Sequence, residues 1–132
     1  MNIGIASEKS GLPSKTIRYY EDIGLVRPAR TDNGYRDYSV SDIHRLRFLQ
    51  RSRSLGFSVD ECRQLLSLYH DKDRESADVK AIAEARLVEI DRKIAELNGL
   101  CCLLHHMIEH CHGDDRPDCP IIDELAGESL VQ

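Results

Sequence analysis

The fold is decided by residues 76–108, SADVKAIAEARLVEIDRKIAELNGLCCLLHHMI. Apolar side chains recur there every three or four positions, the heptad spacing of a helix that packs along one side. Proline is absent from the stretch, and Gly99 costs about 1 kcal/mol, which a long helix tolerates. At a rise of about 1.5 Å per residue, the predicted helix is roughly 50 Å long. We call its apolar stripe the seam: Leu87, Ile90, Ile94, Leu97, Cys101, Leu104 and Ile108.

The seam predicts a homodimer. A chain of 132 residues is too small to cover so long a helix, so the seam is expected to pair with its copy in a second subunit. Aromatic residues are sparse, with no Trp, two Phe and five Tyr. This composition fits long helices with aliphatic seams better than one large globular core.

The segment before this helix predicts a helix-turn-helix. Two short helices, residues 2–9 and about 14–23, are joined by a turn at Gly11, and Asn2 is placed to cap the first. In the second helix Ile17 and Tyr20 are expected to face inward. Its outward face is rich in basic and aromatic groups, so it predicts binding in the major groove of double-stranded DNA, although such a face is often merely solvated. The candidate DNA-binding residues there are Ser14, Lys15, Arg18 and Tyr19.

A small wing and two further helices are expected next. Asn33-Gly34 predicts a tight turn, and residues 35–38 alternate like the returning edge of a hairpin. Ser41 is expected to cap a third helix that ends near Leu55. Ser58 and Glu61 have the spacing of a capping box at the start of a fourth.

Charge is divided unevenly along the chain. The net charge is −5, but residues 1–56 carry +4 and residues 57–132 carry −9. A basic head on an acidic body favours a nucleic-acid partner for the head. The sequence has no apolar run long enough to span a membrane and no signal peptide, so we expect a cytoplasmic protein with no membrane partner. Its five cysteines are then expected to be thiols or ligands rather than structural disulfides.

A two-thiol loop follows the long helix. Cys111 and Cys119 flank a segment rich in Gly, Asp and Pro, and Pro120 predicts the first residue of a short helix with Cys119 as its cap. Thiolates are soft ligands that favour Cu(I), Zn(II) and related ions over Mg(II) or Ca(II). Two thiols without further ligands suit a monovalent ion better than tetrahedral zinc. The loop therefore predicts a metal site at Cys111 and Cys119.

The order of these parts resembles the MerR family of transcription activators, in particular its copper-efflux, Cu(I)-responsive branch. The resemblance is carried by Ile17-Arg18-Tyr19-Tyr20-Glu21, by residues 34–38, by Leu55-Gly56-Phe57-Ser58, by residues 76–80 and by the Cys-x7-Cys-Pro loop. It implies a winged helix-turn-helix on an otherwise helical chain, with an antiparallel coiled-coil dimer. It also implies that the dimer binds promoter DNA, distorts it for RNA polymerase when Cu(I), Ag(I) or Au(I) is bound, and switches on copper-efflux and tolerance genes. By resemblance, Arg36 and Tyr38 of the wing contact phosphates.

The same resemblance gives a role to the start of the long helix. Regulators of divalent ions in this family have a Cys at that position, whereas this chain has Ser76, so a third thiolate is missing. Two thiolates and one monovalent cation leave a charge of −1. We expect Lys80, one turn after Ser76, to supply a compensating cation, across the dimer. The division that follows is a DNA-binding domain over 1–70, a dimerisation coiled coil over 76–108, and a metal loop with its tail over 109–132.

Several alternatives stay open. The signal could be Zn(II), Hg(II) or thiol oxidation, and His110 or His112 could add a ligand. A cytosolic metal buffer or chaperone is a further alternative, but it leaves the basic helix without a role. The sequence shows no nucleophilic triad, phosphate loop or paired acids, so we do not expect an enzyme. Cys62 and Cys101 are expected to be small core residues.

Overall fold

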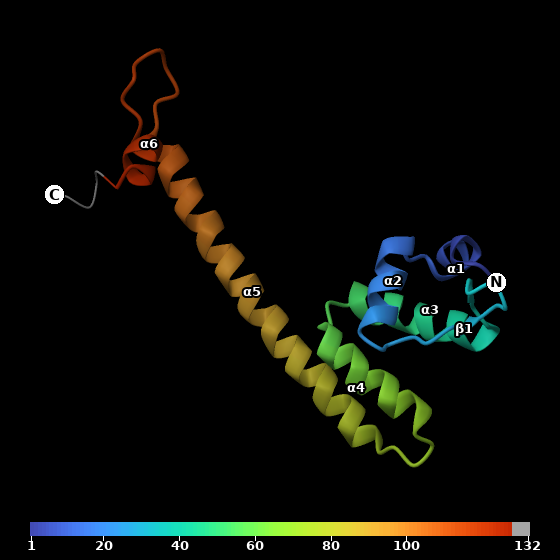
Figure 1. Cartoon of the computed structure of the whole chain (residues 1–132). Helices are drawn as coiled ribbons and strands as arrows, with labels where there is room; N and C mark the ends of the chain where they lie inside the picture. The colour runs from blue at the N-terminus through green and yellow to red at the C-terminus, as the bar shows by residue number, and fades with distance from the viewer. Residues whose placement is uncertain (128–132) are drawn as a thin grey trace. The chain divides into compact units, whose positions relative to one another are not determined.

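The computed structural model describes residues 1–127, so residues 128–132 of the predicted C-terminal domain lie outside the described residues. The chain divides into two compact units, Met1–Arg86 and Leu87–Gln132. We call the first unit the head and residues 87–127 the arm. The elements in order are α1 (Ile3–Ser10), α2 (Ser14–Asp22), β1 (Ala29–Arg30), β2 (Arg36–Asp37), α3 (Val40–Ser54), α4 (Val59–His70), α5 (Ser76–His110) and α6 (Pro120–Leu125) (Figure 1).

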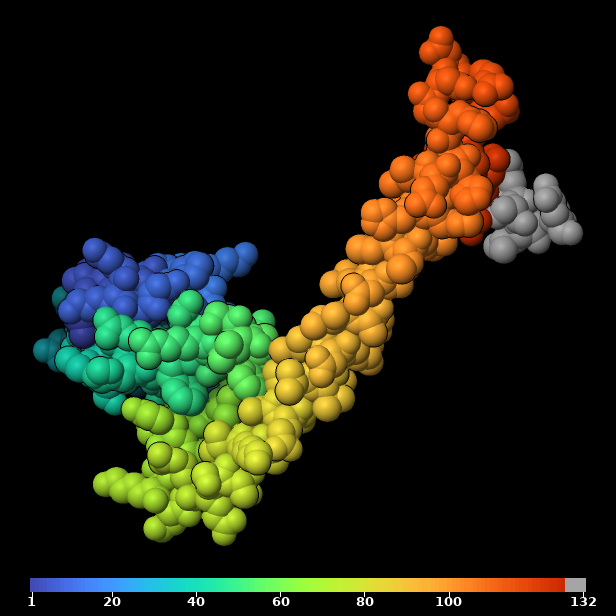
Figure 2. All heavy atoms as spheres, turned by 180° about the vertical axis from the view of Figure 1, so that it is seen from behind, coloured from blue at the N-terminus to red at the C-terminus, as the bar shows by residue number. Residues whose placement is uncertain are grey.

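The head encloses the hydrophobic core. Helix α1 packs on α2 and α3, and α3 packs on α4; the atoms of residues 1–70 form one packed body in Figure 2. The predicted inward residues Ile17 and Tyr20 of α2 are buried there, and so is Cys62 of α4. The remaining members of the core are Ala6, Leu12, Leu25, Val26, Tyr38, Ile43, Leu46, Leu49 and Leu66.

Local signals position the helix-turn-helix as expected. The Ile5 N–H donates to the Asn2 side chain at 2.9 Å, so Asn2 caps α1. Gly11 ends α1 in the left-handed conformation, and α2 begins at Ser14, directly after Pro13. These caps set the turn that fixes α2 relative to α1.

The wing is a two-stranded antiparallel hairpin in which Arg30 pairs with Arg36 and Ala29 with Asp37. Its turn closes through a hydrogen bond from the Gly34 N–H to the Thr31 carbonyl at 2.8 Å, and Gly34 has a φ of 83°. Since a side chain is strained at that φ, glycine is the residue the turn requires.

The cap of α3 corrects the sequence-based expectation. Ser39, not Ser41, precedes the helix, and its side chain accepts from the Asp42 N–H at 3.1 Å. The Asp42 carboxylate in turn accepts from the Ser39 N–H at 2.9 Å, which completes a capping box. Ser39 is the cap because Asp42 lies three residues after it. At this spacing the backbone N–H groups of both Ser39 and Asp42 find a side-chain acceptor.

The head extends beyond residue 70 into the first turns of α5. Gly56, between α3 and α4, has a φ of 88°, and an added Cβ would lie 3.2 Å from the Arg86 guanidinium. Val79 lines a small apolar pocket with Phe48, Leu65 and Tyr69. Residues 76–86 therefore pack with the DNA-binding segment. The boundaries drawn from the sequence, at residues 70, 76 and 108, stay predictions.

The arm consists of the rest of α5, the two-thiol loop and α6. Helix α5 includes Ser76 as its first residue and runs two residues past the predicted end at Ile108. Of its residues only Met107 is buried. Helix α6 lies beside the last turns of α5 (Figure 1). The seam is open in the single chain; Leu97, for example, is 60% exposed. In the described part of the chain, no helix is long and apolar enough to cross a membrane.

Candidate DNA interface and metal centre

The outer face of α2 presents the predicted groove-reading residues. Lys15, Arg18 and Tyr19 are exposed, while Ser14, the first residue of the helix, is half-buried. Since Ile17 and Tyr20 anchor the opposite face in the core, these side chains project from a helix whose rotation is fixed. Such a face can present hydrogen-bond donors to base edges and phosphates.

The wing and α2 share a basic cavity of about 320 Å³. Arg18 of α2 lines it together with Arg30, Arg36 and the exposed Tyr35 of the wing. Three guanidinium groups lie around this concave surface, and arginine is the side chain that donates hydrogen bonds in pairs to phosphate oxygens. The structure thus brings two of the predicted residues, Arg18 and Arg36, to one place.

Glu21 organises this cavity. Its carboxylate accepts from Arg30 Nη2 at 2.7 Å and, through its other oxygen, from Arg36 Nε. The carboxylate side chain is 16% exposed and that of Arg36 is 30% exposed. The hydrogen bond that Arg36 donates to Glu21 raises the pKa of Arg36, since the carboxylate acceptor stabilises the charged guanidinium. Glu21 therefore ties the recognition helix to both strands of the wing.

Tyr38 does not lie where a phosphate contact requires it. Its side chain is only 1% exposed and belongs to the head core. Among the described residues no partner meets its hydroxyl, and burial raises its pKa. The alternation of side chains along a strand predicts that Arg36 and Tyr38 point to the same face of the wing. The strand ends at Asp37, however, so the alternation no longer holds at Tyr38, and its ring lies in the core.

Sequence reasoning missed Arg30 and Glu21. Arg30 precedes the wing turn, and only the pairing of Arg30 with Arg36 shows that the two arginines are neighbours. The Asn33-Gly34 turn predicted a hairpin but not this register, because a two-residue loop at 33–34 would place Arg30 opposite Asp37 and not opposite Arg36. Arg53 donates to the Phe57 carbonyl at 2.6 Å and supports the turn between α3 and α4.

The two predicted ligands of the loop do come together. Cys111 directly follows α5 and Cys119 is the N-cap residue of α6, with Pro120 first in that helix, as expected. The two sulfur atoms lie 3.7 Å apart, and both residues are half-buried. One ion can contact both sulfurs, because a metal–thiolate bond is about 2.3 Å long and the span is less than twice that length. The donor set therefore fits a soft metal ion.

The start of α6 favours the thiolate form of Cys119. The cap side chain makes no full hydrogen bond, but interaction with the backbone N–H of Ile122 is the main cause that lowers the pKa of Cys119. Smaller contributions with the same sign come from the Cys111 side chain and the Ile121 N–H. Since thiolates are the metal-binding form, the lowered pKa reduces competition from protons near neutral pH.

No third ligand joins the thiols within residues 1–127, where no three His, Cys, Asp or Glu side chains form a group able to hold a metal. His110 instead donates from Nδ1 to the His106 carbonyl at 2.7 Å. His112 is exposed in the loop. The auxiliary histidine ligand considered from the sequence is not part of the dithiol pair in this chain.

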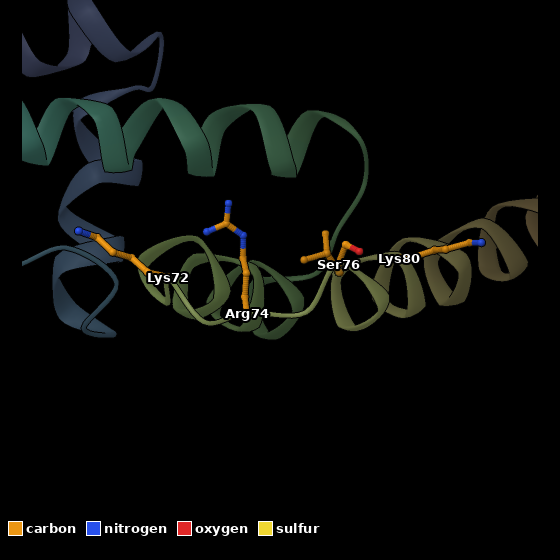
Figure 3. A pocket seen from close by; sticks show the side chains of 5 residues that line it. Lys72, Arg74, Ser76 and Lys80 are labelled. Atoms are coloured by element: carbon orange, nitrogen blue, oxygen red, sulfur yellow. The ribbon is translucent and has the colours of Figure 1, made fainter.

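Ser76 and Lys80 lie in the head, at the start of α5. They line a pocket of about 660 Å³ with Lys72, Arg74 and Val79. Figure 3 shows the Lys72 and Lys80 side chains extending in opposite directions, and Lys80 Nζ lies 3.8 Å from Glu84. Ser76 and Lys80 thus belong to a different unit from the thiols.

These features define a class: a winged helix-turn-helix DNA-binding protein with a helical arm that ends in a dithiol loop. Comparison with known families agrees. The model of the MerR HTH family regulatory protein matches residues 1–68, and the model described as MerR, DNA binding, matches residues 43–107. The chain belongs to the MerR family of transcription regulators, whose members act on DNA and are not enzymes.

Individual relatives span nearly the whole chain. It is 71% identical over 126 residues to the HTH-type transcriptional regulator HmrR of Rhizobium leguminosarum bv. viciae, which covers 96% of this chain and 98% of the relative. It is 48% identical to the regulator CueR of Yersinia pestis, over 96% of this chain and 92% of that one. The solved structure of PbrR691 from Ralstonia metallidurans CH34 with lead(II) superposes with a TM-score of 0.82 at 31% identity, covering 95% of this chain and 98% of the other.

Proposed function

We propose that this protein is a metal-responsive transcription activator that binds promoter DNA as a homodimer in the cytoplasm. Its effector is a monovalent soft ion, Cu(I), with Ag(I) and Au(I) as chemical equivalents, held by Cys111 and Cys119. Its targets are genes for copper efflux and tolerance. The observation that carries the proposal is the pair of sulfur atoms 3.7 Å apart, with Cys119 activated at a helix start.

DNA binding rests on α2 and the wing. Lys15, Arg18 and Tyr19 enter the major groove, with Ser14 at the helix start, while Arg36 grips phosphate beside Arg30. Arg36→Ala is therefore expected to weaken binding to cognate and scrambled duplexes alike, and to reduce the salt slope by about one. A loss confined to the cognate duplex in fluorescence anisotropy would contradict the phosphate role.

The preference for a monovalent ion follows from charge and ligand number. Two thiolates around Cu(I) leave a charge of −1, whereas a divalent ion would be neutral but short of the ligands it prefers. Lys80 of the second subunit supplies a compensating cation, and Ser76 stands where a third thiolate would favour divalent ions. The relatives named HmrR and CueR support a metal-sensing role for the family branch.

Activation requires that the bound ion favour one conformation of the dimer over another. The ion can shift that equilibrium only by its differential affinity for the two states. In the chain itself one thiol follows the end of α5 and the other precedes α6. A bound ion therefore changes the distance between these two helix ends and the protonation of both thiols. The dimer then presents the promoter to RNA polymerase in a usable alignment.

The decisive experiment is transcription in vitro by RNA polymerase from the cognate promoter under buffered Cu(I), Ag(I), Zn(II) and Hg(II). The expected result is activation by the monovalent ions, lost in Cys111→Ser and in Cys119→Ser. Cys102→Ser is the matched control, since that thiol is exposed but stands apart from the pair. Activation by Zn(II) or Hg(II), or by an oxidant without metal, would replace Cu(I) with the divalent or the redox alternative.

A second variant tests discrimination. Ser76→Cys restores the third thiolate and is expected to broaden the response towards Zn(II) or Hg(II). Lys80→Met removes the compensating charge and is expected to weaken the response to Cu(I) without affecting DNA binding in the absence of metal. If both variants respond to the same metal ions as the unmodified protein, Ser76 and Lys80 take no part in selecting the metal ion.

A further inference from the structure

The end of α5 carries a histidine pair that the dithiol site does not use. His106 and His110 are one helical turn apart, and their ring centroids lie 4.1 Å from each other. Both side chains are exposed. Two histidines at positions i and i+4 share one face of a helix and are a recurring arrangement for binding zinc.

Hydrogen bonding prepares His110 to act as a ligand. Its Nδ1 lies 2.7 Å from the His106 carbonyl oxygen. A carbonyl oxygen can only accept, so Nδ1 is the donor, and in the neutral imidazole Nε2 is then the nitrogen that carries the lone pair. Metal-binding histidines usually donate their other ring nitrogen in this way, which fixes the tautomer and the ring orientation. The lone pair of His110 is therefore available on the exposed side.

The pair lies away from the seam. Counting from Leu104 and Ile108, which lie on the seam, His106 and His110 fall on the other side of the helix. Met107, the buried residue between them in the sequence, lies on a third side of the helix. Pairing of the seam with a second copy would therefore leave both imidazoles in contact with solvent.

We propose that His106 and His110 form a second metal site, specific for a divalent borderline ion such as Zn(II), Ni(II) or Cu(II). Imidazole suits these ions, whereas the thiols of the loop suit softer ones. Since no group of three ligands forms within residues 1–127, the two imidazoles are the protein ligands and water fills the other positions. The site is distinct from the dithiol pair and does not depend on the proposed response to Cu(I).

Binding at this site has a local structural consequence. A metal that bridges residues 106 and 110 closes the last turn of α5, directly before Cys111. Stapling that turn opposes fraying at the helix end. A divalent ion would thus stabilise the segment that carries one thiol of the effector site without entering that site.

The test uses the full chain with Cys111 and Cys119 both replaced by Ser, so that the dithiol pair cannot bind the ion. Zn(II) is titrated by calorimetry, and histidine ring protons are followed by NMR. One Zn(II) per chain is expected, with shifts confined to His106 and His110. His106→Gln and His110→Gln are each expected to weaken binding more than about tenfold, because even loss of an outer-shell partner costs that much.

His105→Gln is the matched control, an exposed neighbour on the same helix. It and Cys102→Ser are expected to keep the Zn(II) affinity, and circular dichroism checks that each variant stays helical. An equal loss in His105→Gln or in Cys102→Ser, or unchanged affinity in His110→Gln, would overturn the site. Failure of the Cu(I) transcription assay would leave this result untouched, since the thiols are absent from the tested chain.

Discussion

The head and the arm solve the problem of burying apolar surface in opposite ways. In the head, Leu46 of α3 is 0% exposed and belongs to a core with residues from α1, α2, α3 and α4. In the arm, Leu97 of α5 is 60% exposed and its neighbours on the seam are also open. A helix with an open apolar stripe is stable when another surface covers it. The head is thus complete within one chain, whereas the arm needs a second one.

The largest expected effect comes from damaging the complete region. Leu46→Ala leaves a cavity in the head core and is expected to lower the free energy of unfolding by about 2–5 kcal/mol. Urea unfolding followed by circular dichroism at one fixed protein concentration measures this. A loss below about 1 kcal/mol would mean that the head core is looser than its burial indicates.

The corresponding change in the arm should spare the head and act on association. If the seam pairs with its copy, Leu97→Ala removes about 1.5 kcal/mol or more of hydrophobic association free energy from each subunit. The dimer dissociation constant, from sedimentation equilibrium, should rise roughly a hundredfold for the two copies together. An unchanged dissociation constant would exclude Leu97 from the dimer interface and contradict the statement that the arm is completed by a second chain.

A smaller effect is expected where Glu21 joins α2 to the wing. Glu21→Gln weakens the contacts of this side chain with Arg30 and Arg36. The free energy of DNA binding should become less favourable by about 1 kcal/mol, and the effect is no larger because both arginines are partly exposed.

Asp22→Asn is the matched control, because it removes the same charge from the next, exposed residue. Removing a negative charge alone should tighten DNA binding slightly. Equal tightening in both variants, measured by fluorescence anisotropy, would show that Glu21 acts only through net charge.

The cap of α3 should contribute about 1 kcal/mol to stability. Ser39→Ala removes the capping box and is expected to lower the urea midpoint of the head, whereas Ser41→Ala, at an exposed position inside the helix, should leave it nearly unchanged. The reverse order of the two variants would return the cap to Ser41.

The smallest change is a shift of a titration curve, and it contrasts one thiol from each region. Burial raises the pKa of Cys62 in the head, whereas interaction with the Ile122 N–H lowers that of Cys119 in the arm. As pH rises, Cys119 should therefore become reactive towards iodoacetamide below the ordinary thiol value of about 8.5, and Cys62 only above it. Mass spectrometry of the alkylated peptides measures both. Half-maximal labelling of Cys119 above that value would contradict its activation.

Much of the fold was predictable because its signals are local. Asn2, Gly11, Pro13, Ser58 and Pro120 act on backbone groups within a few residues, so the helix ends they mark agree with the structure. The error at Ser41 has the same origin: two serines stand near the start of α3, and the choice between them depends on which side chain reaches the Asp42 N–H. Spacing alone favours Ser39, which lies three residues before Asp42.

The candidate sites were less predictable, because their members are brought together by distant segments. Arg30, Glu21 and Arg36 meet only after the hairpin pairs and α2 docks beside it. Tyr38 has the residue type of a DNA contact, but its direction is set by the exit of the chain from the wing. The sequence predicted that Cys111 and Cys119 flank one loop. It did not predict that their sulfur atoms lie 3.7 Å apart.

By itself, the sequence determined the helical class of this protein, its family resemblance, the inward face of α2 and the position of the two-thiol loop, since these depend on periodicity, caps and residue type. Only the tertiary structure decided that Tyr38 belongs to the core and that Glu21 holds both wing arginines. The physical reason is range: periodicity and capping act within a turn or two of helix, whereas burial and hydrogen bonding between segments require the folded chain.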